Sequence, residues 1–331
     1  MVSAGSYVLS VALLAALILS LGFSAVRLRQ RLMPGWEGAP AHLVEAVVGV
    51  ALLIWISELL GVVNLLYAGT VVVAALLLAA AIAFGPRVLS REEGGAAGEG
   101  VLDPPPPTPP AGEAPLPGGG GVGGPTPEEA LATAGGGGSP APTGPAGPWA
   151  MSLVAVGVVA LVFAHWGLTT ADALSRGIFN FDSLWYHMPF AVDMAQSHSV
   201  TGLHYTETVF TNWFYPQNSE LLHAVGILIT DRDTLSLFLN LGWLGMAFLA
   251  AWCIGRPYGK GPLTVVAAGV LLECHTLVVR EPGAAKNDVM AAALLLAAIA
   301  ILINADWGGP LRRGRGGSSR LRRPVFRTNH S

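Results

Sequence analysis

Long, nearly uninterrupted apolar runs dominate the hydrophobic pattern of this chain. A helix that crosses a membrane needs roughly 20 mostly apolar residues. Stretches that meet or approach this length lie at residues 7–26, 43–63, 66–85, 150–168, 235–254, 263–279 and 289–304. A further stretch, 221–229, is too short to cross and is expected to lie at the membrane interface or to lead into the next span. The pattern therefore predicts an all-α, polytopic membrane helix bundle with about seven transmembrane helices.

Composition agrees with this prediction and narrows the classes of partner. Of the 331 residues, 52% are hydrophobic and only 12% are charged, whereas soluble domains carry about 25% charged residues. The formal net charge of −3 gives no reason to expect a nucleic-acid partner. The apolar composition makes membrane lipids the expected surroundings. The cysteines Cys253 and Cys274 fall within apolar runs and are interpreted as small hydrophobic residues.

Basic residues orient the predicted spans. They follow the first, third, fifth and seventh spans as Arg27, Arg29, Arg31, Arg87, Arg91, Arg256, Lys260, Arg312, Arg313 and Arg315. By the positive-inside rule these ends are cytoplasmic. The prediction is a multi-pass plasma-membrane protein with its N-terminus outside and its C-terminus in the cytoplasm. The loop 169–234 and the turn 280–288 would then both be extracytoplasmic.

The chain divides by composition into four parts. Residues 1–91 form a three-span N-terminal unit, and 149–305 form a second membrane region that contains the large loop. Between them, 92–148 are mostly Pro and Gly and predict a disordered cytoplasmic linker, because such a segment cannot bury a core. Residues 306–331 are basic and Gly-rich and are expected to form a cytoplasmic tail.

The first candidate site lies in "FNFDSLWYHMPFA", residues 179–191. Trp185 and Tyr186 suit the membrane interface, where aromatic residues are enriched, but that tendency does not explain Asp182 and His187. An aspartate at a membrane mouth can serve as a general base or help to bind a metal-bridged phosphate. Further along the loop, Glu220 lies among aromatic and hydrogen-bonding residues. That mixture suits carbohydrate, and an ordinary structured loop is the alternative.

The second candidate site is the turn before the last span. Asn287 or Asp288 would cap the following helix. A helix N-terminus with Lys286 beside it also attracts phosphate, and Arg280 would add a second cation. Two acids within spans, Glu58 and Glu273, are interpreted mainly as structural contacts inside the bundle. No His or Cys cluster has zinc spacing, so no metal site is predicted from spacing.

Three segments, "FDSLWYHMPFA", "YPQNSELLHA" and "KNDVMAAALLLAA", resemble polytopic glycosyltransferases of the GT-C superfamily. The resemblance covers about residues 150–305 and is to the dolichyl-phosphate-mannose protein mannosyltransferase-like members of actinobacterial type. It implies transfer of a sugar from a polyprenyl-phosphate donor to a glycan, lipid or protein acceptor on the outer face. It implies a catalytic or acceptor-binding role for Asp182 and contact of Lys286, helped by Arg280, with the donor phosphate. A divalent metal ion is a possible cofactor.

The chain departs from that family in having fewer spans, three of which precede the family-like region. It is therefore expected to correspond to the N-terminal part of such an enzyme. A non-catalytic membrane scaffold or inactive fragment is the main alternative. A transporter or flippase is the other, and it would require polar groups near the bilayer midplane and broken helices.

Overall fold

The computed structural model describes residues 4–96, 148–202 and 212–308, and every regular element in these ranges is helical. The α-helices are α1 (Ala4–Leu32), α2 (Ala39–Val62), α3 (Ala68–Ala96), α5 (Pro148–Arg176), α6 (Met188–Ser197), α7 (Asn218–Thr230), α8 (Thr234–Gly255), α9 (Gly261–Leu272), α10 (His275–Arg280) and α11 (Asp288–Gly308). Short helical turns of other kinds are η1 (Ser183–His187), η2 (Asn212–Phe214) and η3 (Arg256–Tyr258). The predicted all-α class is confirmed for this part of the chain.

Six of the described helices are long and apolar enough to cross a membrane. They lie at Ala4–Leu32, Ala39–Val62, Ala68–Gly85, Trp149–Arg176, Thr234–Tyr258 and Asp288–Ala305. Each contains or nearly contains a span predicted from the sequence. The short apolar stretch 221–229 is also helical, as part of α7.

The prediction of a continuous span over 263–279 is wrong. The helix α9 ends at Leu272, Cys274 is extended (φ −64°, ψ 144°), and α10 begins at His275. Twelve residues of helix rise about 18 Å, which is little more than half of a hydrocarbon core of about 30 Å. The break coincides with Glu273, whose carboxylate lies 2.8 Å from Nδ1 of His165 on α5. An average hydrophobicity over the whole stretch hides the charge of Glu273, whose partner lies on another helix.

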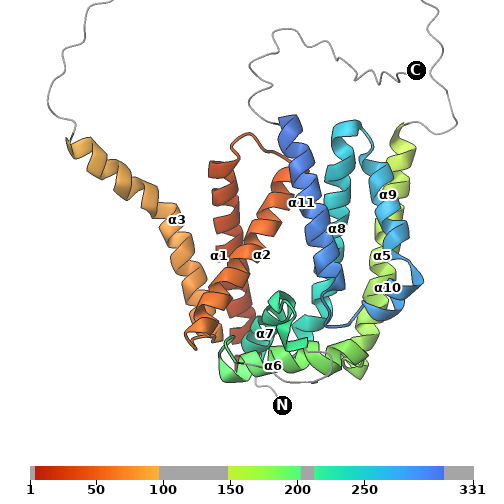
Figure 1. Cartoon of the computed structure of the whole chain (residues 1–331). Helices are drawn as coiled ribbons and strands as arrows, with labels where there is room; N and C mark the ends of the chain where they lie inside the picture. Colours follow the sequence, from red (N-terminus) through yellow and green to blue (C-terminus); the bar gives the residue numbers. More distant parts are fainter. Residues whose placement is uncertain (1–3, 97–147, 203–211, 309–331) are drawn as a thin grey trace, which may run out of the picture.

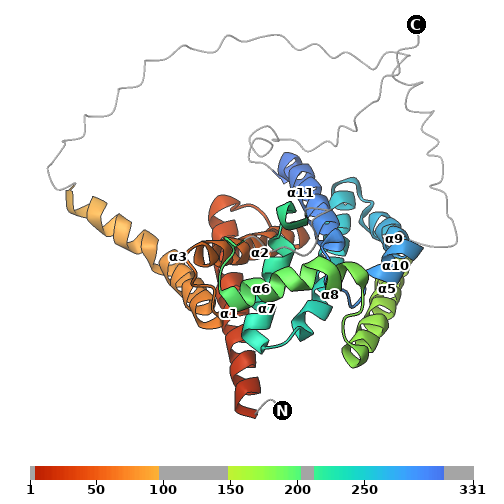
Figure 2. The same cartoon turned by 60° about the horizontal axis from the view of Figure 1, so that its bottom comes forward.

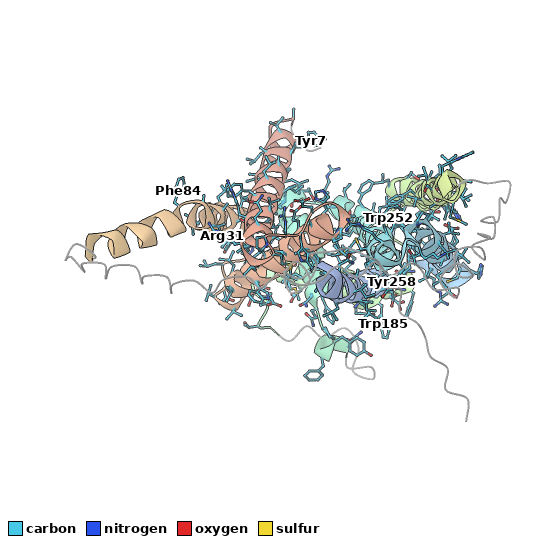
Figure 3. All side chains as sticks on the ribbon, turned by 90° about the horizontal axis from the view of Figure 1, so that it is seen from above. Tyr7, Arg31, Phe84, Trp185, Trp252 and Tyr258 are labelled. Carbon is cyan, nitrogen blue, oxygen red and sulfur yellow. The ribbon has the colours of Figure 1, made fainter. Side chains whose placement is uncertain are left out.

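The centre of the bundle is α8, which packs against α11, α9, α5, α7 and α2. In its most apolar stretch 56% of residues are buried, against 17–33% in the other candidate spans. In Figure 1 α1, α2 and α3 stand on one side, α5 and α9 on the other, and α8 and α11 between them. Seen from above, Arg31 lies on the side of the bundle formed by α1, α2 and α3, and Trp252 and Tyr258 lie toward the other side (Figure 3).

The two ends of the bundle differ in character. The upper end in Figure 1 contains the end of α1, the start of α2 and the end of α8. Arg29, in the last turn of α1, pairs with Glu45 of α2 at 2.6 Å, and Arg256 follows α8. At the lower end α6 lies across the bundle with α7 beside it (Figures 1 and 2). The broken pair α9–α10 returns the chain to this lower end, where α11 begins. Which end faces the cytoplasm stays a prediction.

Parts of the predicted domain organisation fall outside this description. Residues 92–96 of the predicted linker continue α3. The rest of that linker, 97–147, and the tail from 309 lie outside the described residues. The same is true of residues 203–211 within the predicted loop.

Candidate functional site

One ammonium group and three carboxylates form the most concentrated group of charges at the lower end of the bundle. Nζ of Lys286 lies 2.9 Å from Glu281, 3.0 Å from Asp288 and 3.4 Å from Asp182. We call these four residues the Lys286 cluster. The Lys286 and Glu281 side chains are almost fully buried, whereas those of Asp182 and Asp288 are 37% and 56% exposed. The cluster is thus anchored inside the protein and reaches the surface through two aspartates.

Polar contacts join two segments that are about one hundred residues apart in the sequence. The side-chain amide of Asn180 donates to the carbonyl of Arg280 at 3.2 Å. The backbone N–H of Ala285 donates to the hydroxyl of Ser183 at 3.1 Å. The ion pair between Asp182 and Lys286 is a third contact between the same two segments. The position of Asp182 against the turn is therefore held by its neighbours as well as by its own charge.

The turn 281–286 is buried between α5 and α8. Gly283 has φ +68°, and a Cβ there would lie 2.6 Å from Cβ of Ala173 on α5. Only glycine suits both this left-handed conformation and this close approach. On the other side, the buried amide of Asn240 on α8 donates to the carbonyls of Glu281 and Ala284, at 2.8 and 3.2 Å. These contacts satisfy a loop backbone that would otherwise be buried without partners.

Asp182 directly precedes a single π-helical turn, η1. Pro189 follows near the start of α6, and proline has no N–H to donate to the helical ladder. The regular hydrogen-bond register is therefore interrupted at this point, and the backbone widens before it. Such π-turns recur at functional sites because they re-aim the side chains around them.

The cluster carries more negative than positive charge. The Lys286 ammonium donates a hydrogen bond to Glu281 and forms ion pairs with Asp288 and, at a longer distance, with Asp182. With every group ionised the four residues sum to a charge of −2.

Burial raises the pKa of the Glu281 carboxyl, and the hydrogen bond and charge of Lys286 only partly offset this. For Lys286 itself burial acts to lower the pKa, but hydrogen bonds to Glu281 and Asp288 outweigh it and the pKa rises. Lys286 therefore stays charged at neutral pH.

A second, fully buried polar group lies behind the cluster. Nδ1 of His187 makes a short contact with a carboxylate oxygen of Glu220 on α7, and both side chains are at most 2% exposed. His223, one turn further along α7, is 1% exposed, and neither of its ring nitrogens has a hydrogen-bond partner among the described residues. Burial, and then the charge of His187, lower the pKa of His223 to about 3. His223 is therefore a neutral buried imidazole.

Tyr186 connects the buried group to the surface. Its ring lies 4.0 Å from the ring of His187 and meets the ring of Tyr215 edge-on at 6.2 Å, between centroids. Burial, followed by the charges of Asp182, Glu220 and Asp288, raises the pKa of Tyr186 to about 12. The phenol therefore remains protonated and can donate a hydrogen bond at neutral pH.

The sequence-predicted site residues separate into two groups. Asp182, Lys286 and Asp288 come together in the Lys286 cluster, and His187 and Glu220 pair with each other beneath it. The side chains of His187 and Glu220 are closed off from solvent in this conformation. A substrate would therefore contact the residues around them and not the pair itself.

The remaining predicted residues lie at the margin. Arg280 is exposed at the end of α10, and only its backbone carbonyl is drawn into the contact with Asn180. The carbonyl of Asn287 accepts from the N–H of Ala291 at 2.9 Å, as expected of a residue that begins a helix. Glu281 was not singled out from the sequence. Its position in the same short turn as Lys286, five residues earlier, is the signal that could have identified it.

A divalent cation bound only by protein side chains has little support here. Within the described ranges no three His, Cys, Asp or Glu side chains are placed to hold a metal ion. Magnesium bound together with a substrate phosphate, however, commonly uses only one or two carboxylates. The partly exposed Asp182 and Asp288 fit that smaller requirement.

Comparison of the chain with protein-family models, with curated proteins and with solved structures gives no match. The family resemblance drawn from the three sequence segments therefore stays a prediction, and function has to be argued from the site itself.

Proposed function

We propose that this chain is a membrane glycosyltransferase, or the N-terminal part of one, that uses a sugar carried on a polyprenyl phosphate. The observation that carries the proposal is the position of Asp182. Its carboxylate is partly exposed at one end of a membrane bundle and is held beside an almost buried lysine from a distant turn. A general base must lie within hydrogen-bond reach of the hydroxyl whose proton it removes, and a fixed, solvent-accessible carboxylate can meet that requirement.

In the proposed reaction an acceptor hydroxyl attacks the anomeric carbon of the lipid-linked sugar. The new carbon–oxygen bond forms as the bond from that carbon to the phosphate oxygen breaks. Asp182 takes the hydroxyl proton, and the polyprenyl phosphate leaves with both electrons of the broken bond. Before the donor binds, Lys286 holds the carboxylate of Asp182 in place, because its other two contacts, to Glu281 and Asp288, fix the ammonium. With the donor bound, the contacts of Asn180 and Ser183 with the turn keep Asp182 in position.

The charge of the site bears on how the donor would bind. A cluster with a charge of −2 repels a phosphate, and Lys286 already has close contacts with Glu281 and Asp288. A phosphate would reach Lys286 by replacing the longest of its contacts, the one to Asp182. A divalent cation, if bound, would be held by Asp182 and Asp288 and would neutralise charge on the phosphate.

The test is a transfer assay on membranes that contain the full chain, supplied with radiolabelled polyprenyl-phosphate sugars. Loss of a general base typically costs about 10²- to 10⁴-fold in rate, so Asp182→Asn should reduce transfer to near background. Asp172→Asn is the matched control, since Asp172 lies on α5 and its side chain pairs, among the described residues, only with the nearby Arg176 at the exposed surface. Transfer that is undiminished in Asp182→Asn, with equal membrane insertion, would contradict the proposal.

One observation favours a transporter as the second candidate. Transporters bind their substrates at interrupted helices near the midplane, and α9 is interrupted beside the pair formed by His165 and Glu273. Uptake or flipping of a labelled polyprenyl-phosphate sugar in sealed vesicles separates the two functions. A transporter would lose that movement in Glu273→Gln and keep it in Asp182→Asn.

A further inference from the structure

A cavity with a volume of about 430 Å³, lined by both polar and apolar side chains, is not explained by the reaction above. It lies between the C-terminal part of α2, the end of α6 and the start of α7. The residues whose side chains give it chemical character are Glu58, Thr201, Tyr215, Gln217, Asn218 and Leu221. Its volume falls within the range of about 300–1,000 Å³ that small-molecule sites occupy.

The N-terminal three-helix unit supplies one wall of this cavity, and close contacts fix that wall. The turn between α2 and α3 lies beside the end of α6 (Figure 1). The N–H of Leu66 donates to the carbonyl of His198 at 3.2 Å, and the rings of Tyr67 and His198 stack at 3.7 Å. The N–H of Val200 donates to the carbonyl of Gly61, where a Cβ would lie only 2.6 Å from a methyl group of Val200. Glu58 is one helical turn before Gly61, so its position is set by this contact.

The chemistry of the lining points to a neutral, hydroxyl-rich ligand. Glu58 is the one charged residue among the residues named as lining the cavity, and the described residues give it no cationic partner. A carboxylate in such a place accepts hydrogen bonds from hydroxyl groups. Tyr215 is 49% exposed and presents an aromatic ring of the kind on which the apolar face of a sugar packs. A phosphate in this cavity would be repelled by Glu58.

The cavity also connects to the proposed reaction centre. The ring of Tyr215, in its wall, meets the ring of Tyr186, which lies four residues after Asp182. Leu221, in its floor, directly follows Glu220 of the buried pair. A ligand in the cavity would therefore lie near Tyr186 and the buried pair of His187 and Glu220.

We propose that this cavity is a carbohydrate-binding subsite for the acceptor, with Glu58 as its hydrogen-bond acceptor and Tyr215 as its stacking surface. The N-terminal unit would then be part of the substrate site rather than a separate anchor. This assignment of the acceptor rests on the proposed glycosyl transfer, whereas the binding of a sugar at Glu58 does not. The ligand class is a neutral pyranoside, and the lipid-phosphate donor is assigned to the Lys286 cluster.

The test is saturation-transfer NMR on the full chain in detergent micelles. The probes are the methyl α-D-glycosides of glucose, mannose and galactose, with glycerol as a small acyclic polyol for comparison. At least one glycoside should receive saturation from the wild-type protein well above glycerol. Glu58→Ala should weaken its binding about tenfold, the order expected when a hydrogen bond to a charged group is lost. Tyr215→Leu, a change at an exposed position that does not threaten folding, should weaken it as well.

Matched variants separate this proposal from the proposed function. Glu37→Ala removes an exposed acid from the opposite end of the bundle and should leave sugar binding unchanged. Asp182→Asn should also keep sugar binding while it loses transfer. Absence of glycoside binding to the wild type would overturn the subsite. So would binding as tight as that of the wild type in both Glu58→Ala and Tyr215→Leu. Glycoside binding without any transfer would instead count against the glycosyltransferase proposal and leave sugar binding at Glu58 standing.

Discussion

The sharpest quantitative prediction concerns the replacement of Lys286 by methionine, which keeps the length of the side chain and removes its charge. In the wild type the ammonium lies 2.9 Å from the carboxylate of Glu281, and the side chains are 7% and 2% exposed. Removing one partner of a buried pair leaves an uncompensated charge in the interior, at a cost of about 3–5 kcal/mol. Lys286→Met should therefore lower the free energy of unfolding by about that amount.

The other two contacts of Lys286 should add little. Asp182 and Asp288 are 37% and 56% exposed, so water already screens their charges. Exposed ion pairs contribute about 0–1 kcal/mol each. Glu281 accordingly dominates the effect, and a second change at this residue should reverse it. The double variant Lys286→Met with Glu281→Gln should regain most of the lost stability.

The effect should also depend on pH with a defined sign. Burial already raises the pKa of Glu281 above that of an unfolded glutamate, and loss of the lysine charge raises it further. The folded variant then binds a proton on Glu281 more readily than the unfolded chain does, so its stability increases as pH falls toward the ordinary range of a glutamate. The deficit of Lys286→Met relative to wild type should thus shrink between pH 7.5 and pH 5.5.

The assay is reversible unfolding in mixed micelles by added dodecyl sulfate, followed by circular dichroism. Lys260→Met, at an exposed position at the opposite end of the bundle, is the matched control and should leave the unfolding free energy unchanged. A cost for Lys286→Met below about 1 kcal/mol would refute the reasoning, because a buried pair cannot be broken so cheaply. A double variant no more stable than the single one would refute it as well.

Two further predictions use the same assay. The pKa of His223 is lowered to about 3, against about 6.5 in an unfolded chain. The stabilisation is therefore complete above pH 6.5 and is lost as pH falls toward 3, so wild type should lose about 2–3 kcal/mol more than His223→Leu between pH 7.5 and 4.5. Equal losses in the two proteins would show that His223 is accessible to protons. Gly61→Ala places a Cβ 2.6 Å from a methyl group of Val200 and should cost about 1–3 kcal/mol. The second change Val200→Ala should restore this loss, and Gly69→Ala, which meets no atom within 4 Å, should cost less. A Gly61→Ala cost no larger than that of Gly69→Ala would mean that α2 and Val200 do not approach so closely.

Several features of the fold were predictable from the sequence because they depend on local patterns. A helix that crosses a membrane must satisfy its backbone internally and present apolar side chains over its whole length. The runs that became α1, α2, α5, α8 and α11 meet this requirement within a single segment. Averaged hydrophobicity failed at 263–279, where Glu273 ends α9 and pairs with His165, more than one hundred residues earlier. A local pattern contains no information about such a partner.

The candidate site shows the same division. Asp182, Lys286 and Asp288 were recognisable as polar residues at the ends of spans, because ionisable groups in such places are expensive unless they have a role. The sequence did not show that Glu281 would take part, or that His187 and Glu220 would be buried as a pair. These outcomes depend on the turn 281–286 entering the space between α5 and α8, which Gly283 and Asn240 make possible.

By itself, then, the sequence determined that this is a helical membrane protein, where most of its helices lie, and which charged residues stand at their ends. Tertiary structure alone decided which of those charges meet. It brought Asp182 within 3.4 Å of Lys286 and set Glu58 of the N-terminal unit in a cavity beside Tyr215. The physical reason is that apolar periodicity is a property of one segment. An ion pair or a cavity, by contrast, is a property of several segments, and only their packing brings these together.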